Sequence, residues 1–138
     1  APTNVRNILY HIQLQQLTPI IAHVERYPYL RDNPEQLYKW VDAGAICQIN
    51  ASSLLSHPAD RSFIYACLKH QLAHILASDT HSIKKRPPQL RDAFEAVERK
   101  CGQALADTLR NNTLDIAGNQ NVAPAYMEPL RHFGKWFF

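Results

Sequence analysis

Residues 19–50, PIIAHVERYPYLRDNPEQLYKWVDAGAICQIN, contain a complete strand–helix–strand unit. The apolar run 19–23 predicts a strand buried on both faces. Asn33 and Pro34 favour a helix start, and Gly44 favours its end. Residues 45–50 predict a second strand. A helix of this length between two strands indicates parallel pairing through a right-handed crossover. The apolar face expected for the helix is Leu37, Trp40 and Val41.

The same alternation continues outward along the chain. Apolar residues at helical spacing predict a helix near the start that ends before Pro19, and further helices over 59–70, 90–101 and 103–110. A third strand is predicted over 72–78. We therefore expect an α/β fold of parallel strands alternating with helices. A closed α/β barrel takes about 250 residues, so 138 residues with three strands predict part of a larger barrel, or association with another chain.

Composition places the chain among globular proteins. It is 46% hydrophobic and 20% charged, and its net charge of +3 is dispersed, so binding to nucleic acid is not predicted. No apolar run is long enough for a membrane span and the first residues show no secretory pattern, so we expect a cytoplasmic protein. Three widely spaced cysteines, Cys47, Cys67 and Cys101, predict reduced thiols in or near the core. Residues 1–121 form the predicted domain, and 122–138 an aromatic and basic extension.

Polar side chains follow each predicted strand. His23-Val24-Glu25-Arg26 follows the first, Gln48 and Asn50 end the second, and Ser78-Asp79-Thr80-His81 ends the third. Parallel strands bring their carboxyl ends to one edge, where ligands bind in such folds. Asp79 and His81 are two residues apart and share a face. With His23 they suit Mn²⁺, Fe²⁺ or Zn²⁺. In the alternative interpretation, Asp79 caps a turn and the histidines bond to backbone.

Two arginines adjoin these candidate ligands. Arg26 comes three residues after His23, and Arg86 five after His81. A guanidinium group binds two phosphate oxygens at once, so this position favours a phosphate site. The alternative for each arginine is a surface ion pair or a solvated loop.

Taken together, these strand ends resemble the polymerase and histidinol phosphatase (PHP) superfamily. The matching blocks are IIAHVERY (20–27), QIN (48–50), ASDTH (77–81) and RPP (86–88). Within it they are most similar to the bacterial manganese-dependent protein-tyrosine phosphatases of capsule and exopolysaccharide synthesis. The resemblance implies the carboxyl-terminal part of a distorted (β/α)7 barrel. It also implies that His23, Asp79 and His81 bind metal, most often manganese, and that Arg26 and Arg86 bind the substrate phosphate.

The resemblance further implies a metal-dependent phosphotyrosine-protein phosphatase that regulates polysaccharide synthesis, with a polysaccharide-export tyrosine kinase as its protein substrate. Two departures from the family pattern matter. Val24 stands where the family motif has proline, and the opening D-x-H-x-H ligand segment has no counterpart in these residues. We therefore expect weak or no activity from this chain alone, and a homo-oligomer. The alternatives are another PHP-type phosphoesterase acting on small molecules, or a non-catalytic binding module.

Overall fold

The structure is a computed structural model that describes residues 4–56, 58–80, 89–122 and 127–130. Two predicted site residues, His81 and Arg86, and the aromatic residues 136–138 lie outside the described residues. The elements, in chain order, are α1 (Val5–Leu14), β1 (Ile20–Ile21), the 3₁₀ turn η1 (Val24–Arg26), α2 (Pro28–Asp32), α3 (Glu35–Asp42), β2 (Ile46–Asn50), α4 (Ala51–Leu55), α5 (Pro58–Lys69), β3 (Ile75–Ala77), α6 (Leu90–Cys101) and α7 (Gln103–Ala117).

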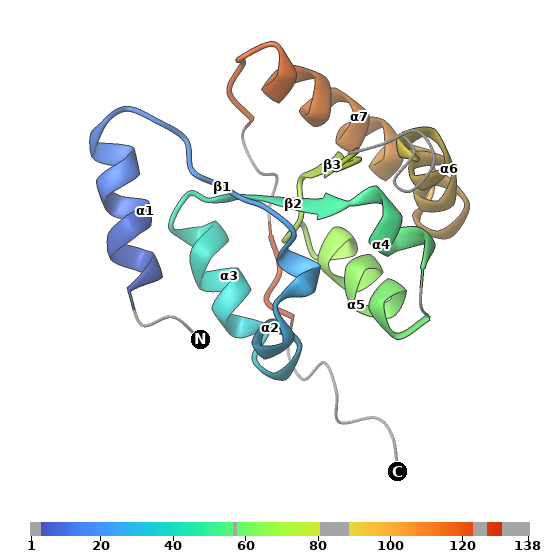
Figure 1. Ribbon diagram of the computed structural model, residues 1–138, viewed down its shortest axis with the longest axis horizontal. Coiled ribbons are helices and arrows are strands. Elements are labelled where there is room, and N and C mark those ends of the chain that lie inside the picture. The colour runs from blue at the N-terminus through green and yellow to red at the C-terminus, as the bar shows by residue number, and fades with distance from the viewer. Residues whose placement is uncertain (1–3, 57, 81–88, 123–126, 131–138) are drawn as a thin grey trace.

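The strands form a parallel sheet in the order β1-β2-β3. Ile20 lies opposite Ile46, and Gln48 opposite Ile75. Helices α3 and α5, which carry the chain from one strand to the next, lie below the strands in the view of Figure 1, and α7 lies above β3. This arrangement confirms the α/β prediction. No helix in the described part of the chain is both long and apolar enough to cross a membrane.

The core is built mostly from the predicted apolar faces, but the prediction that 19–23 is a strand buried on both faces is wrong: β1 has two residues, of which Ile20 is exposed and Ile21 half-buried. All five residues of β2 are buried, which is expected for a parallel strand covered on both sides. Cys47 and Cys67 are buried free thiols, and Cys101 is half-buried. Further buried side chains come from α3, α5 and α6: Leu37, Trp40, Val41, Phe63, Ile64, Leu68, Ala93, Phe94 and Val97.

The structure differs from the sequence prediction at short elements. Helices α2 and α4 have five residues each, too short for a periodic pattern to be recognised. Helix α7 continues to Ala117, and β3 covers only three residues of the predicted strand 72–78. Asn33 does not cap α3, because it ends α2 and Pro34 takes the capping position.

Part of the predicted extension contacts the core. Leu130 is buried, and the backbone N–H of Glu128 donates to the carbonyl oxygen of His70 at 3.0 Å. Residues 127–130 have no regular secondary structure. The division of the chain into a domain and an extension after residue 121 stays a prediction.

Candidate active site

Two of the predicted metal ligands occupy unusual backbone conformations at the strand ends. His23, which follows β1, has φ of 55°, and Asp79, which follows β3, has φ of 47°. Residues other than glycine rarely adopt this left-handed region, and the conformation costs on the order of 1 kcal/mol. Such strain is concentrated at functional sites, where surrounding contacts hold it in place. Both strand ends therefore turn sharply at the residues selected from sequence.

His23 is held by the neighbouring strand. Its backbone N–H donates to the side-chain oxygen of Gln48 at 3.0 Å. Its ring Nδ1 atom is buried and has no hydrogen-bond partner among the described residues. A buried polar atom without a partner costs about 1–3 kcal/mol, so a ligand at this nitrogen would remove that cost. The amide nitrogen of Gln48 is also buried without a partner.

Glu25 connects the turn after β1 to the end of β2. Its side chain is 2% exposed, and one carboxylate oxygen accepts from the Ser53 hydroxyl at 2.7 Å and from the Asn50 backbone N–H at 3.3 Å. The other oxygen is buried and has no hydrogen-bond partner in the part of the chain that the structure describes. Sequence reasoning gave Glu25 no role of its own. The sequence signal for Glu25 is its position directly after the apolar residue Val24, whose side chain is fully buried in the structure.

Asn50, the last residue of β2, contacts residues that follow β1 and β3. Its side-chain NH₂ donates to Asp79 Oδ2 at 3.4 Å, and its side-chain oxygen caps α4 by accepting from the backbone N–H of Ser52 at 3.0 Å. The Arg26 guanidinium lies 3.8 Å from the same Asp79 oxygen, and 3.9 Å from the Glu25 carboxylate. Gln48 and Asn50 are two residues apart on β2 and share a face. His23 and Asp79 are thus both bonded to residues on one face of β2.

The turn that contains Arg26 forms without the family's proline. The backbone N–H of Arg26 donates to the His23 carbonyl oxygen at 2.9 Å, and the Val24 side chain packs in the core. The Arg26 side chain is 48% exposed, so it can reach a ligand from solvent. The structure brings Arg26 and Asp79 together, and it holds the His23 backbone against Gln48 of β2.

The described residues test the metal prediction only in part. Within residues 4–56, 58–80, 89–122 and 127–130, no group of three or more His, Cys, Asp or Glu side chains could hold a metal ion. His81, the third predicted ligand, falls outside those ranges. The donor types at the strand ends fit a divalent ion, because His23 offers a buried imidazole nitrogen that has no partner among the described residues and Asp79 offers a carboxylate.

His74 shows what a structural histidine looks like in this fold. It is 2% exposed, its Nδ1 accepts from the backbone N–H of Cys47 at 3.0 Å, and its Nε2 lies 3.1 Å from the Gln71 carbonyl oxygen. Burial lowers the pKa of His74 to about 4. The ring is neutral at pH 7 and joins the start of β3 to β2. The His23 ring nitrogen, by contrast, lacks such a partner.

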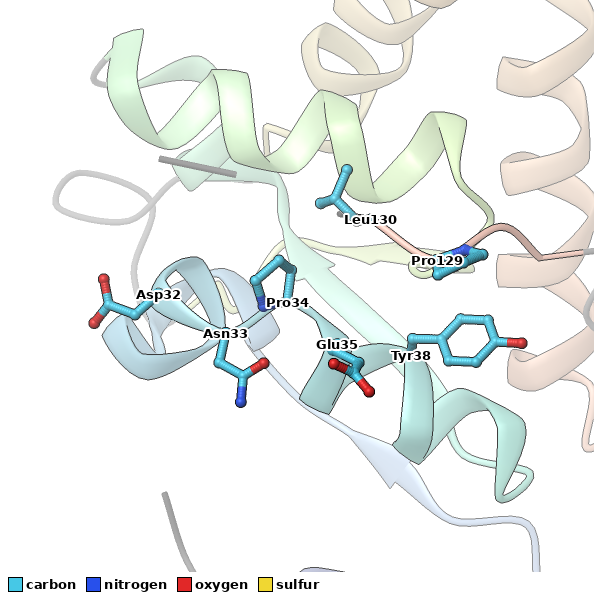
Figure 2. A pocket seen from close by; sticks show the side chains of 7 residues that line it. All are labelled: Asp32, Asn33, Pro34, Glu35, Tyr38, Pro129 and Leu130. Carbon is cyan, nitrogen blue, oxygen red and sulfur yellow. The ribbon is translucent and has the colours of Figure 1, made fainter. Parts of the chain in front are cut away.

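A separate hollow lies away from the strand ends. A pocket of about 480 Å³ is lined by Asn33, Glu35, Tyr38, Pro129 and Leu130, among others. Figure 2 shows Pro129 beside the Tyr38 ring, with Asn33 and Glu35 across the hollow. None of the strand-end residues lines this pocket. The candidate site is therefore identified by its side-chain chemistry and not by the size of a cavity.

The fold and these side chains define a parallel α/β protein with a polar site at the carboxyl ends of its strands. The chain belongs to the family described as capsular polysaccharide synthesis, CpsB/CapC, which matches residues 2–116. This membership confirms the resemblance that the strand-end motifs suggested.

Curated relatives agree with this assignment. The chain is 30% identical over 133 residues to the tyrosine-protein phosphatase YwqE of Bacillus subtilis, and 32% identical over 139 residues to the putative tyrosine-protein phosphatase CapC of Staphylococcus aureus. These alignments cover 95% and 99% of this chain, but 52% and 54% of the relatives. The chain thus spans about half the length of the curated relatives that it matches.

A solved structure matches the fold over almost the whole chain. It comes from work on YwqE of Bacillus subtilis and CpsB of Streptococcus pneumoniae, described as unique metal-dependent tyrosine phosphatases. The TM-score is 0.89 at 30% identity, and the alignment covers 96% of this chain and 54% of the solved one. The three-stranded parallel sheet with its helices is therefore the architecture found in about half of that phosphatase.

Proposed function

We propose that this chain supplies one part of the active site of a metal-dependent phosphotyrosine-protein phosphatase that acts in capsular or extracellular polysaccharide synthesis. The observation that carries the proposal is the contact of the Arg26 guanidinium with Asp79 at 3.8 Å, which joins the turn after β1 to the end of β3. Relatives named tyrosine-protein phosphatases support the reaction.

In this proposal His23, Asp79 and His81 hold divalent metal, with Mn²⁺ as the expected ion. Bound divalent ions lower the pKa of water and stabilise charge on phosphoryl oxygens. Asn50 orients the Asp79 carboxylate through its hydrogen bond at 3.4 Å. Gln48 fixes the backbone of His23, so that both candidate ligands are positioned from β2.

Arg26 and Arg86 bind the phosphate of phosphotyrosine. Arg26 is half-exposed and is flanked by the carboxylates of Glu25 and Asp79, which orient its guanidinium group. Charge on the equatorial phosphoryl oxygens grows during transfer, and a preorganised guanidinium group stabilises it. Removing such a donor costs about 3 kcal/mol, or on the order of 100-fold in kcat.

A hybrid protein tests the proposal. The chain replaces the matching part of Bacillus subtilis YwqE, and the rest of YwqE is kept. We expect Mn²⁺-dependent hydrolysis of a phosphotyrosine peptide in preference to histidinol phosphate or sugar phosphates. Arg26→Ala should lower kcat about 100-fold, whereas Lys39→Ala, on the distant helix α3, should leave it unchanged. A folded hybrid without hydrolysis, or with equal rates for the two variants, contradicts the proposal.

We expect the chain by itself to hydrolyse phosphotyrosine slowly. Three ligands hold one ion, whereas a site with two metal ions for phosphoryl transfer needs more ligands. Turnover of a phosphotyrosine peptide by the purified 138-residue chain at about 10 s⁻¹, a typical enzyme rate, would refute this expectation.

The remaining parts of the proposal concern partners and location. A tyrosine-phosphorylated polysaccharide-export kinase is the expected substrate, and the cytoplasm the expected compartment. Association of chains is supported by large apolar side chains exposed near β1: Ile8, Tyr10, Leu14, Leu17 and Ile20. Sedimentation at micromolar concentration should show a dimer or higher oligomer, and a compact monomer would contradict this part.

A further inference from the structure

A second basic site lies on the surface formed by α4, α5 and α6. A pocket of about 290 Å³ is lined there by Arg61, Arg99 and Lys100, together with Tyr65 and apolar side chains. None of the described residues that line it is acidic. The pocket at the start of α3, by comparison, is lined by Asp32 and Glu35. The α4–α6 pocket therefore has the charge that favours an anion.

The cations in this pocket are available to a ligand. Arg99 has one acidic neighbour, Glu95, at 3.9 Å on the exposed surface of α6, and an exposed pair of this kind contributes little. Arg61 is half-exposed, and Lys100 is exposed. The positive charges of Arg61 and Arg99 also reach the Tyr65 hydroxyl group, where they oppose the increase in its pKa caused by burial.

The pocket also has an apolar wall. Leu54 and Leu55 of α4 and Ala96 of α6 line it beside the Tyr65 ring, whose hydroxyl donates to the Ala96 carbonyl oxygen at 3.5 Å. An apolar wall next to guanidinium and ammonium groups suits a ligand with a flat apolar ring and a doubly charged end. Arginine forks bind phosphate oxygens in pairs and also stack on rings.

The pocket lies close to the candidate active site. Helix α4 starts directly after Asn50, and Leu54 and Leu55 are its last two residues. At a rise of about 1.5 Å per residue, the helix separates Asn50 from Leu55 by about 7 Å along its axis. An extended peptide covers that length with two or three residues.

We propose that the α4–α6 pocket binds a second phosphotyrosine side chain of the protein substrate, outside the catalytic site. The ring contacts Leu54, Leu55 and Tyr65, and the phosphate contacts Arg61, Arg99 and Lys100. This inference rests on the proposed function for its substrate class. The pocket would then hold multiply phosphorylated segments next to the strand ends and favour them over singly phosphorylated ones.

Binding to the 138-residue chain tests the inference without catalysis. The probe is a labelled peptide with one phosphotyrosine, measured by fluorescence anisotropy with chelator present. The background variant Arg26→Ala/Arg86→Ala removes both proposed strand-end phosphate contacts. We expect this variant to bind the phosphopeptide, and to bind the unphosphorylated peptide at least about tenfold more weakly. Absence of phosphopeptide binding overturns the inference.

Charge variants then locate the binding. In the Arg26→Ala/Arg86→Ala background, Arg61→Ala and Arg99→Ala should each weaken phosphopeptide binding about tenfold. Arg6→Ala removes an equal charge from exposed α1, far from the pocket, and should change Kd less than about twofold. Equal effects at all three positions mean non-specific attraction and overturn the inference.

Amide chemical shifts provide a measurement that does not depend on a variant. Phosphotyrosine should shift the amide signals of Tyr65, Leu55 and Ala96, and inorganic phosphate should displace it only at much higher concentration. Shifts confined to the strand ends, or equal competition by phosphate, overturn the inference. Failure of the YwqE hybrid to hydrolyse phosphotyrosine, with these shifts present, counts against the proposed function and not against the pocket.

Discussion

Protonation of His74 should weaken the fold at acidic pH. Its ring joins Cys47 of β2 to Gln71, and a proton on Nδ1 would break the bond from the Cys47 N–H. Burial lowers the pKa of His74 to about 4, while the hydrogen bond to the Gln71 carbonyl opposes this change. The unfolded chain has the ordinary histidine pKa of about 6.5. Between these values the unfolded state binds the proton and the folded state does not, so stability falls as pH falls.

The size of the effect follows from the two pKa values. At about pH 7.5 both states are neutral and the His74 contribution is complete. At about pH 4.5, protonation of His74 in the unfolded chain lowers the free energy of unfolding by about 2.5 kcal/mol. Urea unfolding followed by Trp40 fluorescence at the two pH values measures the change.

Substitution separates His74 from the other titrating groups. In His74→Asn, the side-chain oxygen can still accept from the Cys47 N–H, and loss of the Gln71 contact costs about 1 kcal/mol at neutral pH. Between about pH 7.5 and 4.5, the free energy of unfolding should fall by about 2.5 kcal/mol less in this variant than in the wild type. His11→Asn, on exposed α1, is the matched control. Equal losses in wild type and His74→Asn would refute the reasoning.

Two further predictions concern a turn and the thiols. Gly44 has φ of 89°, and the Cβ of Gly44→Ala would clash with the side-chain nitrogen of Gln13, which donates to the Ala43 carbonyl oxygen at 2.7 Å. Gly44→Ala should lower the free energy of unfolding by about 1–2 kcal/mol. An unchanged midpoint of urea unfolding would contradict this prediction. Burial raises the pKa of Cys47 to about 12 and also raises that of Cys67. Iodoacetamide should therefore alkylate half-buried Cys101 first, as peptide mass would show, and early loss of the other two thiols would contradict the burial.

The fold class could be predicted from the sequence, and candidate site residues could be selected from it. The mostly apolar segment 45–49 is recognisable from the sequence because β2 is a parallel strand buried on both faces. Strand β1 does not follow this rule, because Ile20 is exposed and Ile21 is only half-buried. Parallel pairing then requires the carboxyl ends of the strands to meet. For that reason His23, Arg26 and Asp79 could be grouped before any coordinates were known.

The supporting contacts of the site were decided only by tertiary structure. Glu25 and Ser53 are 28 positions apart, and their hydrogen bond of 2.7 Å exists because the turn after β1 packs against the start of α4. The same holds for Asn50 and Asp79, and for the basic pocket, whose cations come from two helices that are separate in sequence. Periodicity reports which face of an element is buried. It does not report which distant side chain that face meets, because packing sets the partner.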